Sequence, residues 1–184
     1  MNNLYVGIDP GINNPALVIV EANHVSKPKM IFHRALKLKT AHLPLENRLF
    51  ILWNDFMDVK AMIEFMIEDN KINETAVYIE YPDYEQSNRG QKAAETGGLG
   101  KLILSAGVAF TVFIRLVARS ELLKLIRPIQ WKGQVPKPVT RKRMEEKYEL
   151  QEGLLTDDEI DALGLADYAY ETIRRKSISP KEVT

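Results

Sequence analysis

The chain has 184 residues, and its 25 Lys and Arg residues are balanced by 25 Asp and Glu residues. Its composition, 45% hydrophobic and 27% charged, is that of a globular protein and excludes a disordered chain. The absence of cysteine excludes disulfides, thiolate zinc sites and cysteine nucleophiles. The length fits one domain over residues 1–184, whose last residues, about eight, form a flexible tail.

The sequence shows neither a signal peptide nor an apolar run long enough to span a membrane. The start, Met1-Asn2-Asn3-Leu4, lacks the basic and apolar regions of a signal peptide. The longest uncharged apolar run, 102–114, is too short to span a bilayer. We therefore expect a cytoplasmic protein with no membrane partner.

Short β-branched runs predict strands, and three of them follow one another closely enough to form an antiparallel meander. The turn signal Asp9-Pro10-Gly11 ends the first strand, and Tyr81-Pro82 stops the fourth. The predicted strands are 4–9, 16–20, 30–38, 76–80 and 122–126.

Apolar residues recurring at steps of three and four predict a long amphipathic helix, which ends near Asn70. A later helix is apolar on most sides, which implies burial against more than one surface. Thr156 and Glu159 have the spacing of a capping box for the last helix. The predicted helices are 45–70, 98–118, 139–150 and 156–176, with loops at 83–91 and 130–138. This order predicts an α/β fold, a mixed sheet with helices on its faces.

The charges are segregated along the chain. Residues 124–143 contain seven cations and no anion, and residues 27–39 contain five cations and no anion. Residues 145–171 contain ten carboxylates and a single lysine. Each run by itself fits a solvated face, but together they suit a polyanion-binding surface beside a carboxylate site that holds cations.

Carboxylates at three positions stand out. Asp9 and Glu80 each end a predicted strand, where sites on α/β sheets concentrate. Asp158 and Asp161 lie three apart and share one helix face, although Asp157, four before Asp161, would project similarly. Converging carboxylates repel one another and raise each other's pKa, and oxygen-liganded Mg²⁺ or Mn²⁺ would relieve that repulsion.

Each acid taken singly has a structural explanation. Asp9 precedes Pro and Gly in a turn, Glu80 could pair with a nearby cation, and acids in the first turn of a helix complement its dipole. Acids at two strand ends and on one helix face together favour a site.

Three segments around these acids are similar to motifs of one family. Gly7-Ile8-Asp9-Pro10-Gly11 resembles the opening strand, and Tyr78-Ile79-Glu80 the second acidic strand, of RuvC-type Holliday-junction resolvases of the RNase H-like superfamily. Residues 158–166 resemble the C-terminal acidic helix, and 97–108 the helix that follows the second acid. The resemblance spans residues 4–170.

This resemblance implies an RNase H-like fold, with a five-stranded mixed sheet whose first three strands are antiparallel and helices on both faces. It implies an endodeoxyribonuclease for DNA recombination and repair that resolves four-way junctions as a homodimer, by paired symmetric nicks. Two Mg²⁺ or Mn²⁺ ions per site would support phosphodiester hydrolysis leaving 5′-phosphate and 3′-hydroxyl ends, with no small-molecule cofactor. Such an enzyme would work in a bacterial or phage-infected cell, and a phage origin suits a compact resolvase. The implied metal ligands and catalytic residues are Asp9, Glu80, Asp158 and Asp161.

The basic segment and the 83–91 loop supply candidates for DNA contacts. The resembled family usually has Gln after the second acid and an aromatic three on, whereas Tyr81 and Tyr84 follow Glu80 here. Either Tyr could stack on splayed bases, and Tyr81 could equally pack at the sheet edge. The DNA-binding candidates are Lys132, Lys137, Arg141, Arg143, Tyr84 and Arg89.

Other aromatic and imidazole side chains have no clear place in this scheme. Trp131 could stack on a base or close a loop as a core residue. His24, His33 and His42 lie in early strands and loops away from the acid positions, so we assign them no catalytic role.

Two other functions fit the same residues. Another RNase H-like nuclease, acting on RNA–DNA hybrids, structured RNA or flap DNA, would use the same carboxylates. A junction-binding architectural protein would not need them, so four intact acids count against it.

Overall fold

The computed structural model describes residues 2–23, 26–36, 42–70, 72–82, 95 and 97–178. At its centre is a five-stranded sheet in the order β3-β2-β1-β4-β5. β1 and β3 run antiparallel to β2, whereas β4 runs parallel to β1 and β5 parallel to β4. The predicted mixed sheet with three antiparallel strands is confirmed. The strands are β1 (Asn3–Asp9), β2 (Ala16–Ala22), β3 (Lys29–Ala35), β4 (Glu74–Glu80) and β5 (Leu123–Ile126).

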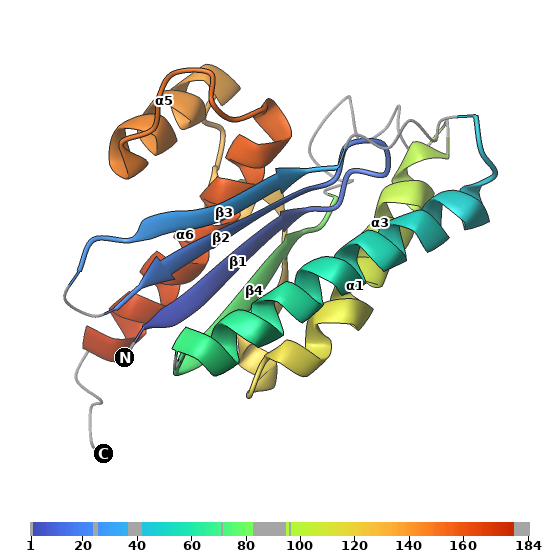
Figure 1. Ribbon diagram of the computed structural model, residues 1–184. Helices are drawn as coiled ribbons and strands as arrows, with labels where there is room; N and C mark the ends of the chain where they lie inside the picture. The colour runs from blue at the N-terminus through green and yellow to red at the C-terminus, as the bar shows by residue number, and fades with distance from the viewer. Residues whose placement is uncertain are drawn as a thin grey trace, which may run out of the picture.

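Helices cover both faces of the sheet (Figure 1). α1 (Leu45–Asn70) and α3 (Gly98–Phe113) pack on one face, and α6 (Asp157–Ile178) packs on the other. Alternate residues of β1 point to opposite faces, so that Val6 contributes to the core under α1 and α3 and Tyr5 to the core under α6. α6 includes the first residues of the predicted tail, and the rest of that tail, residues 179–184, lies outside the described residues.

Gly7 allows α6 to lie directly against β1. A Cβ on Gly7 would stand 1.9 Å from the carbonyl oxygen of Ala162 and 2.6 Å from the amide nitrogen of Ala166. Both alanines are fully buried. The glycine in the first motif therefore brings the beginning of α6 next to the end of β1.

The predicted 130–138 loop is wrong at both ends. A short helix, α4 (Pro128–Trp131), overlaps its start, and α5 (Lys137–Tyr148) begins within it. Pro128 and Pro138 lie in the first turns of these helices, where a residue without an N–H is tolerated. These prolines mark helix starts rather than the interior of a loop.

Two other boundaries differ from prediction. The 98–118 helix is shorter than expected, because α3 gives way to a 3₁₀ turn at Ile114–Leu116, and a second such turn, Ser120–Leu122, replaces the start of the predicted fifth strand. The third strand ends at Ala35 rather than at residue 38, and residues 37–41 lie outside the described part.

α3 is buried on one side only. Ala106 and Ala109 are fully buried against the sheet and α1, whereas Ile103, Leu104 and Ile114 are 39–48% exposed on the other side. The helix thus packs against more than one surface, the sheet and α1, as expected, while its outer side is exposed in the chain by itself. Residues 98–116 are long and apolar enough to cross a membrane by length and composition, a test that the core helix of a folded protein also passes.

Candidate active site

The parallel pairing of β1 with β4 sets two of the acids side by side. Ile8 lies opposite Ile79 in the register, so Asp9 and Glu80, the next residues, end neighbouring strands at the same edge of the sheet. The carboxylate of Asp9 accepts a hydrogen bond from the amide of Gly11 at 3.1 Å, which fixes it in the turn after β1.

A capping box positions the beginning of α6. The amide of Thr156 donates to the carboxylate of Glu159 at 2.8 Å, and the amide of Glu159 donates to the hydroxyl of Thr156 at 3.3 Å. The predicted cap is confirmed. It fixes the first turn of the helix, from which Asp158 and Asp161 project on one face.

Asp157 and Asp158 have different surroundings. Asp157 pairs with the guanidinium of Arg141 at 2.6 Å, and its side chain is 64% exposed. Asp158 is half-buried, and its charge raises the pKa of Asp9, as the charge of Asp161 does. Asp158 is thus the first-turn acid whose charge acts on Asp9.

The four acids Asp9, Glu80, Asp158 and Asp161, here called the acid cluster, repel one another. Burial, and then the charges of Glu80, Asp161 and Asp158, raise the pKa of Asp9 well above its ordinary value. Burial also raises the pKa of Glu80, against the opposing effect of Lys132. For Asp158, burial and the charge of Asp161 likewise raise the pKa, in spite of Lys137. Burial, together with repulsion between the acids, therefore disfavours the charged forms of Asp9, Glu80 and Asp158.

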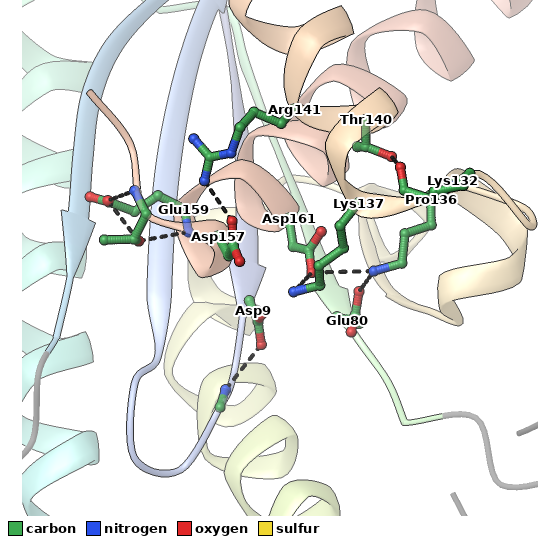
Figure 2. A network of polar contacts seen from close by, with 12 residues as sticks. Asp9, Glu80, Lys132, Pro136, Lys137, Thr140, Arg141, Asp157, Glu159 and Asp161 are labelled. Carbon is green, nitrogen blue, oxygen red and sulfur yellow. Dashed lines mark hydrogen bonds and ion pairs between the residues drawn. The ribbon is translucent and has the colours of Figure 1, made fainter. Parts of the chain in front are cut away.

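Two lysines reach into the acid cluster (Figure 2). Lys132 Nζ lies 3.2 Å from Asp161 Oδ2 and 3.8 Å from Glu80 Oε2. Lys137 Nζ lies 3.1 Å from the same Asp161 oxygen. Both lysines are among the predicted phosphate contacts, and the structure places their charged ends on carboxylates of the same protein.

Trp131 holds Glu80 in place, a contact that sequence reasoning missed. Its indole N–H donates to Glu80 Oε2 at 3.1 Å. The ring lies over Gly164 of α6, where a Cβ would come within 2.2 Å of it. Trp131 is half-buried and closes the segment after β5, so the closing role is the one the structure supports.

His33 contacts the first turn of α6, which its position in the sequence does not suggest. Its Nδ1 lies 2.8 Å from Glu159 Oε1, which links β3 to the beginning of α6. Burial alone would raise the pKa of Glu159, but hydrogen bonds from His33 and Thr156 hold it below its ordinary value. His33 thus anchors the helix that carries two of the acids.

The other DNA-binding candidates are dispersed. Arg141 donates to the carbonyl of Leu155 at 2.9 Å as well as to Asp157, so it ties α5 to the segment before α6. Arg143 is exposed on α5. Tyr81 is partly buried and packs against the core under α1 and α3, as the alternative predicted. Tyr84 and Arg89, with the rest of the predicted 83–91 loop, lie outside the described residues.

The chemistry of the acid cluster suits a hard cation. Four carboxylates supply the oxygen ligands that Mg²⁺ and Mn²⁺ prefer, and a cation would relieve their mutual repulsion. Within the described part of the chain, no three Asp, Glu or His side chains are already gathered closely enough to hold a metal ion. The donor set fits such an ion, and the side chains would have to close around it.

Comparisons with known proteins agree with this fold. No protein-family model matches the chain, and no curated protein matches it. The solved structure of Thermus thermophilus RuvC in complex with a Holliday junction substrate superposes with a TM-score of 0.68 at 17% identity, covering 96% of this chain and 97% of that one. A Thermus thermophilus RuvC structure superposes with a TM-score of 0.66 at 18% identity and the same coverage. The chain therefore has the fold of RuvC, consistent with the RNase H-like fold that its motifs predict.

Proposed function

We propose that this chain is a divalent-metal-dependent endodeoxyribonuclease that resolves four-way DNA junctions. The proposal rests on Asp9 and Glu80, which end the paired strands β1 and β4, and on the charges of Asp158 and Asp161 of α6, which act on Asp9. The fold supports it, because a protein that matches this chain over nearly its whole length is known with a Holliday junction bound.

Asp9, Glu80, Asp158 and Asp161 would hold two Mg²⁺ or Mn²⁺ ions. When bound, such ions activate water and stabilise charge on a phosphodiester under attack. The chain itself positions the ligands. Gly11 fixes Asp9 through its amide, and Trp131 fixes Glu80 through its indole N–H.

Paired cuts need two active sites, and α3 offers a surface on which two chains can meet. Ile103 and Leu104 are exposed on its outer side, and Ile114 is exposed at the start of the 3₁₀ turn that follows it. Gly107 lies in the same helix with nothing within 4 Å of a Cβ position, so a second backbone could approach it closely. We expect a homodimer built on this face.

The experiment that tests the function is a cleavage assay on labelled four-way junction, flap, linear duplex and RNA–DNA hybrid, each with and without Mg²⁺. We expect Mg²⁺-dependent, paired cuts in the junction. Asp9→Asn and Glu80→Gln should abolish cutting and retain junction binding, because they remove ligands for the metal and leave the basic residues unchanged. Preference for the hybrid or the flap would instead identify another RNase H-like nuclease.

The neighbouring acids supply a matched control. Asp157→Asn should cut at nearly the normal rate, because Asp157 pairs with Arg141 outside the cluster, whereas Asp158→Asn should not. The opposite result would make Asp157 the partner of Asp161. Junction binding without cleavage by the unaltered protein, at any Mg²⁺ concentration, would indicate an architectural protein.

A further inference from the structure

The contacts of Lys132 and Lys137 have a consequence for how the acid cluster binds metal. Both ammonium groups lie within 3.2 Å of one oxygen, Oδ2 of Asp161, and Lys132 also approaches Glu80. Asp161 is 4% exposed and the Lys132 side chain is 17% exposed. The Lys132–Asp161 pair is therefore largely shielded from water, unlike ordinary surface salt bridges.

The lysines and a divalent ion would compete for the same oxygens. Three positive groups cannot share one carboxylate oxygen without strong repulsion, which grows as water is excluded. To bind a divalent cation through Oδ2, Asp161 must therefore release at least one ammonium group. The separation of the acids within the described residues agrees with this, since no three of them yet surround one point.

The lysines are able to leave. The Lys137 side chain is 49% exposed in the first turn of α5, so its ammonium group can turn toward solvent without moving the helix. Lys132 follows α4 and lies 4.7 Å from the centre of the Trp131 ring, a contact that does not require Asp161. Lysine has a flexible four-carbon stem, and its ammonium group binds phosphate as a point charge.

We propose that Lys132 and Lys137 exchange the carboxylates of the acid cluster for backbone phosphates when a nucleic acid binds, and so make DNA binding and divalent-cation binding cooperative. Without DNA, the lysines occupy oxygens that the cation needs. With DNA, phosphates draw the lysines away and Asp161 and Glu80 become available. Linkage requires the reciprocal effect, in which the cation raises the affinity for DNA by the same factor. This inference rests on the proposed function and specifies how its site is controlled.

The test measures binding and not cleavage. Calorimetric titration of the full chain with Ca²⁺, which takes oxygen ligands as Mg²⁺ does, gives the cation affinity alone and with a saturating short linear duplex or four-way junction. For the unaltered protein we expect DNA to raise the Ca²⁺ affinity about fivefold or more. Fluorescence anisotropy of labelled DNA should show the same factor when Ca²⁺ is added.

The double variant Lys132→Met, Lys137→Met removes both charges and keeps the stems. It should bind Ca²⁺ without DNA as tightly as the unaltered protein does with DNA, and DNA should then change the affinity less than about twofold. Lys137→Met by itself should show part of this effect, and it covers the case in which the double variant fails to fold. The matched control is Lys142→Met, also on α5, whose exposed side chain pairs only weakly with Glu146 at 3.8 Å. It should behave as the unaltered protein.

Several results would overturn the inference. The first is that the lysine variants, without DNA, bind Ca²⁺ no more tightly than the unaltered protein. The second is that DNA still raises the Ca²⁺ affinity of the double variant. The third is that the unaltered protein binds no Ca²⁺ with or without DNA. The outcome is separate from that of the cleavage assay. Cooperativity can be present in a protein that cuts no junction, and a resolvase can cut junctions with its lysines uncoupled from metal binding.

Discussion

Gly7→Ala tests how closely the sheet and α6 approach each other. The added Cβ would lie 1.9 Å from the carbonyl oxygen of Ala162, and ordinary contacts begin near 3.4 Å, so the helix must move by about 1.5 Å. Because the obstructing atoms belong to the backbone of a buried helix, no change of side-chain rotamer relieves the overlap. We expect a loss at the upper end of the usual range for overpacking, about 3 kcal/mol.

For a chain of this length that loss corresponds to a decrease in Tm on the order of 10 °C. Circular dichroism during thermal and urea unfolding measures it, over a range of protein concentrations that separates folding from self-association. The matched control is Gly107→Ala in α3, where a Cβ meets nothing within 4 Å. At protein concentrations where the chain is monomeric, that change should stabilise the helix by about 0.5–1 kcal/mol.

The same substitution should weaken metal binding more than the loss of stability explains. Ala162 follows Asp161, so a helix displaced from β1 also carries Asp161 away from Asp9. Equal unfolding midpoints for Gly7→Ala and the unaltered protein would refute the described approach of β1 to α6.

Three further outcomes follow from contacts in and around the site. Gly164→Ala should displace the Trp131 ring and so remove the hydrogen bond that orients Glu80. We expect Mn²⁺ binding to weaken about tenfold, and an unchanged affinity in calorimetry would contradict the role of Trp131 in orienting Glu80. The pKa of Glu159 is lowered in the folded state, so its stabilisation is present above the ordinary Glu pKa of about 4.3 and is lost as the pH falls below it. Glu159→Gln should therefore lower the Tm at neutral pH and flatten its decrease below about pH 4.3, while an equally steep decrease would argue against the pairing with His33. Ile103→Glu should convert a dimer into a monomer in light scattering, and a variant that still dimerises would exclude this face of α3.

Local patterns predicted most of the elements, since each depends on residues close together in the chain. The bounds of α1 agree with its apolar periodicity, and Thr156 and Glu159 form the expected cap. The prolines were harder to interpret, because Pro128 follows a predicted strand and Pro138 ends a predicted loop, and yet both lie in the first turns of helices.

The site could be predicted as a set of acids but not as an arrangement. Asp9 and Glu80 each end a strand pattern, yet their adjacency depends on the parallel pairing of β1 with β4, which local sequence does not encode. The contacts of Lys132 with Asp161 and of His33 with Glu159 join residues 29 and 126 positions apart. Lys132 was predicted to contact phosphate because it lies in a basic segment. A pattern of charges along the chain does not show which acid a lysine contacts in the folded protein.

The hydrogen bond between Trp131 and Glu80 gives the molecule a built-in optical probe. The chain has two tryptophans, and the other one, Trp53, lies 37% exposed on α1. Replacing Trp53 with Phe would leave a single tryptophan, whose indole N–H donates to a carboxylate of the acid cluster. Changes in its brightness and emission wavelength would then follow the arrival of a cation in real time, with no attached dye.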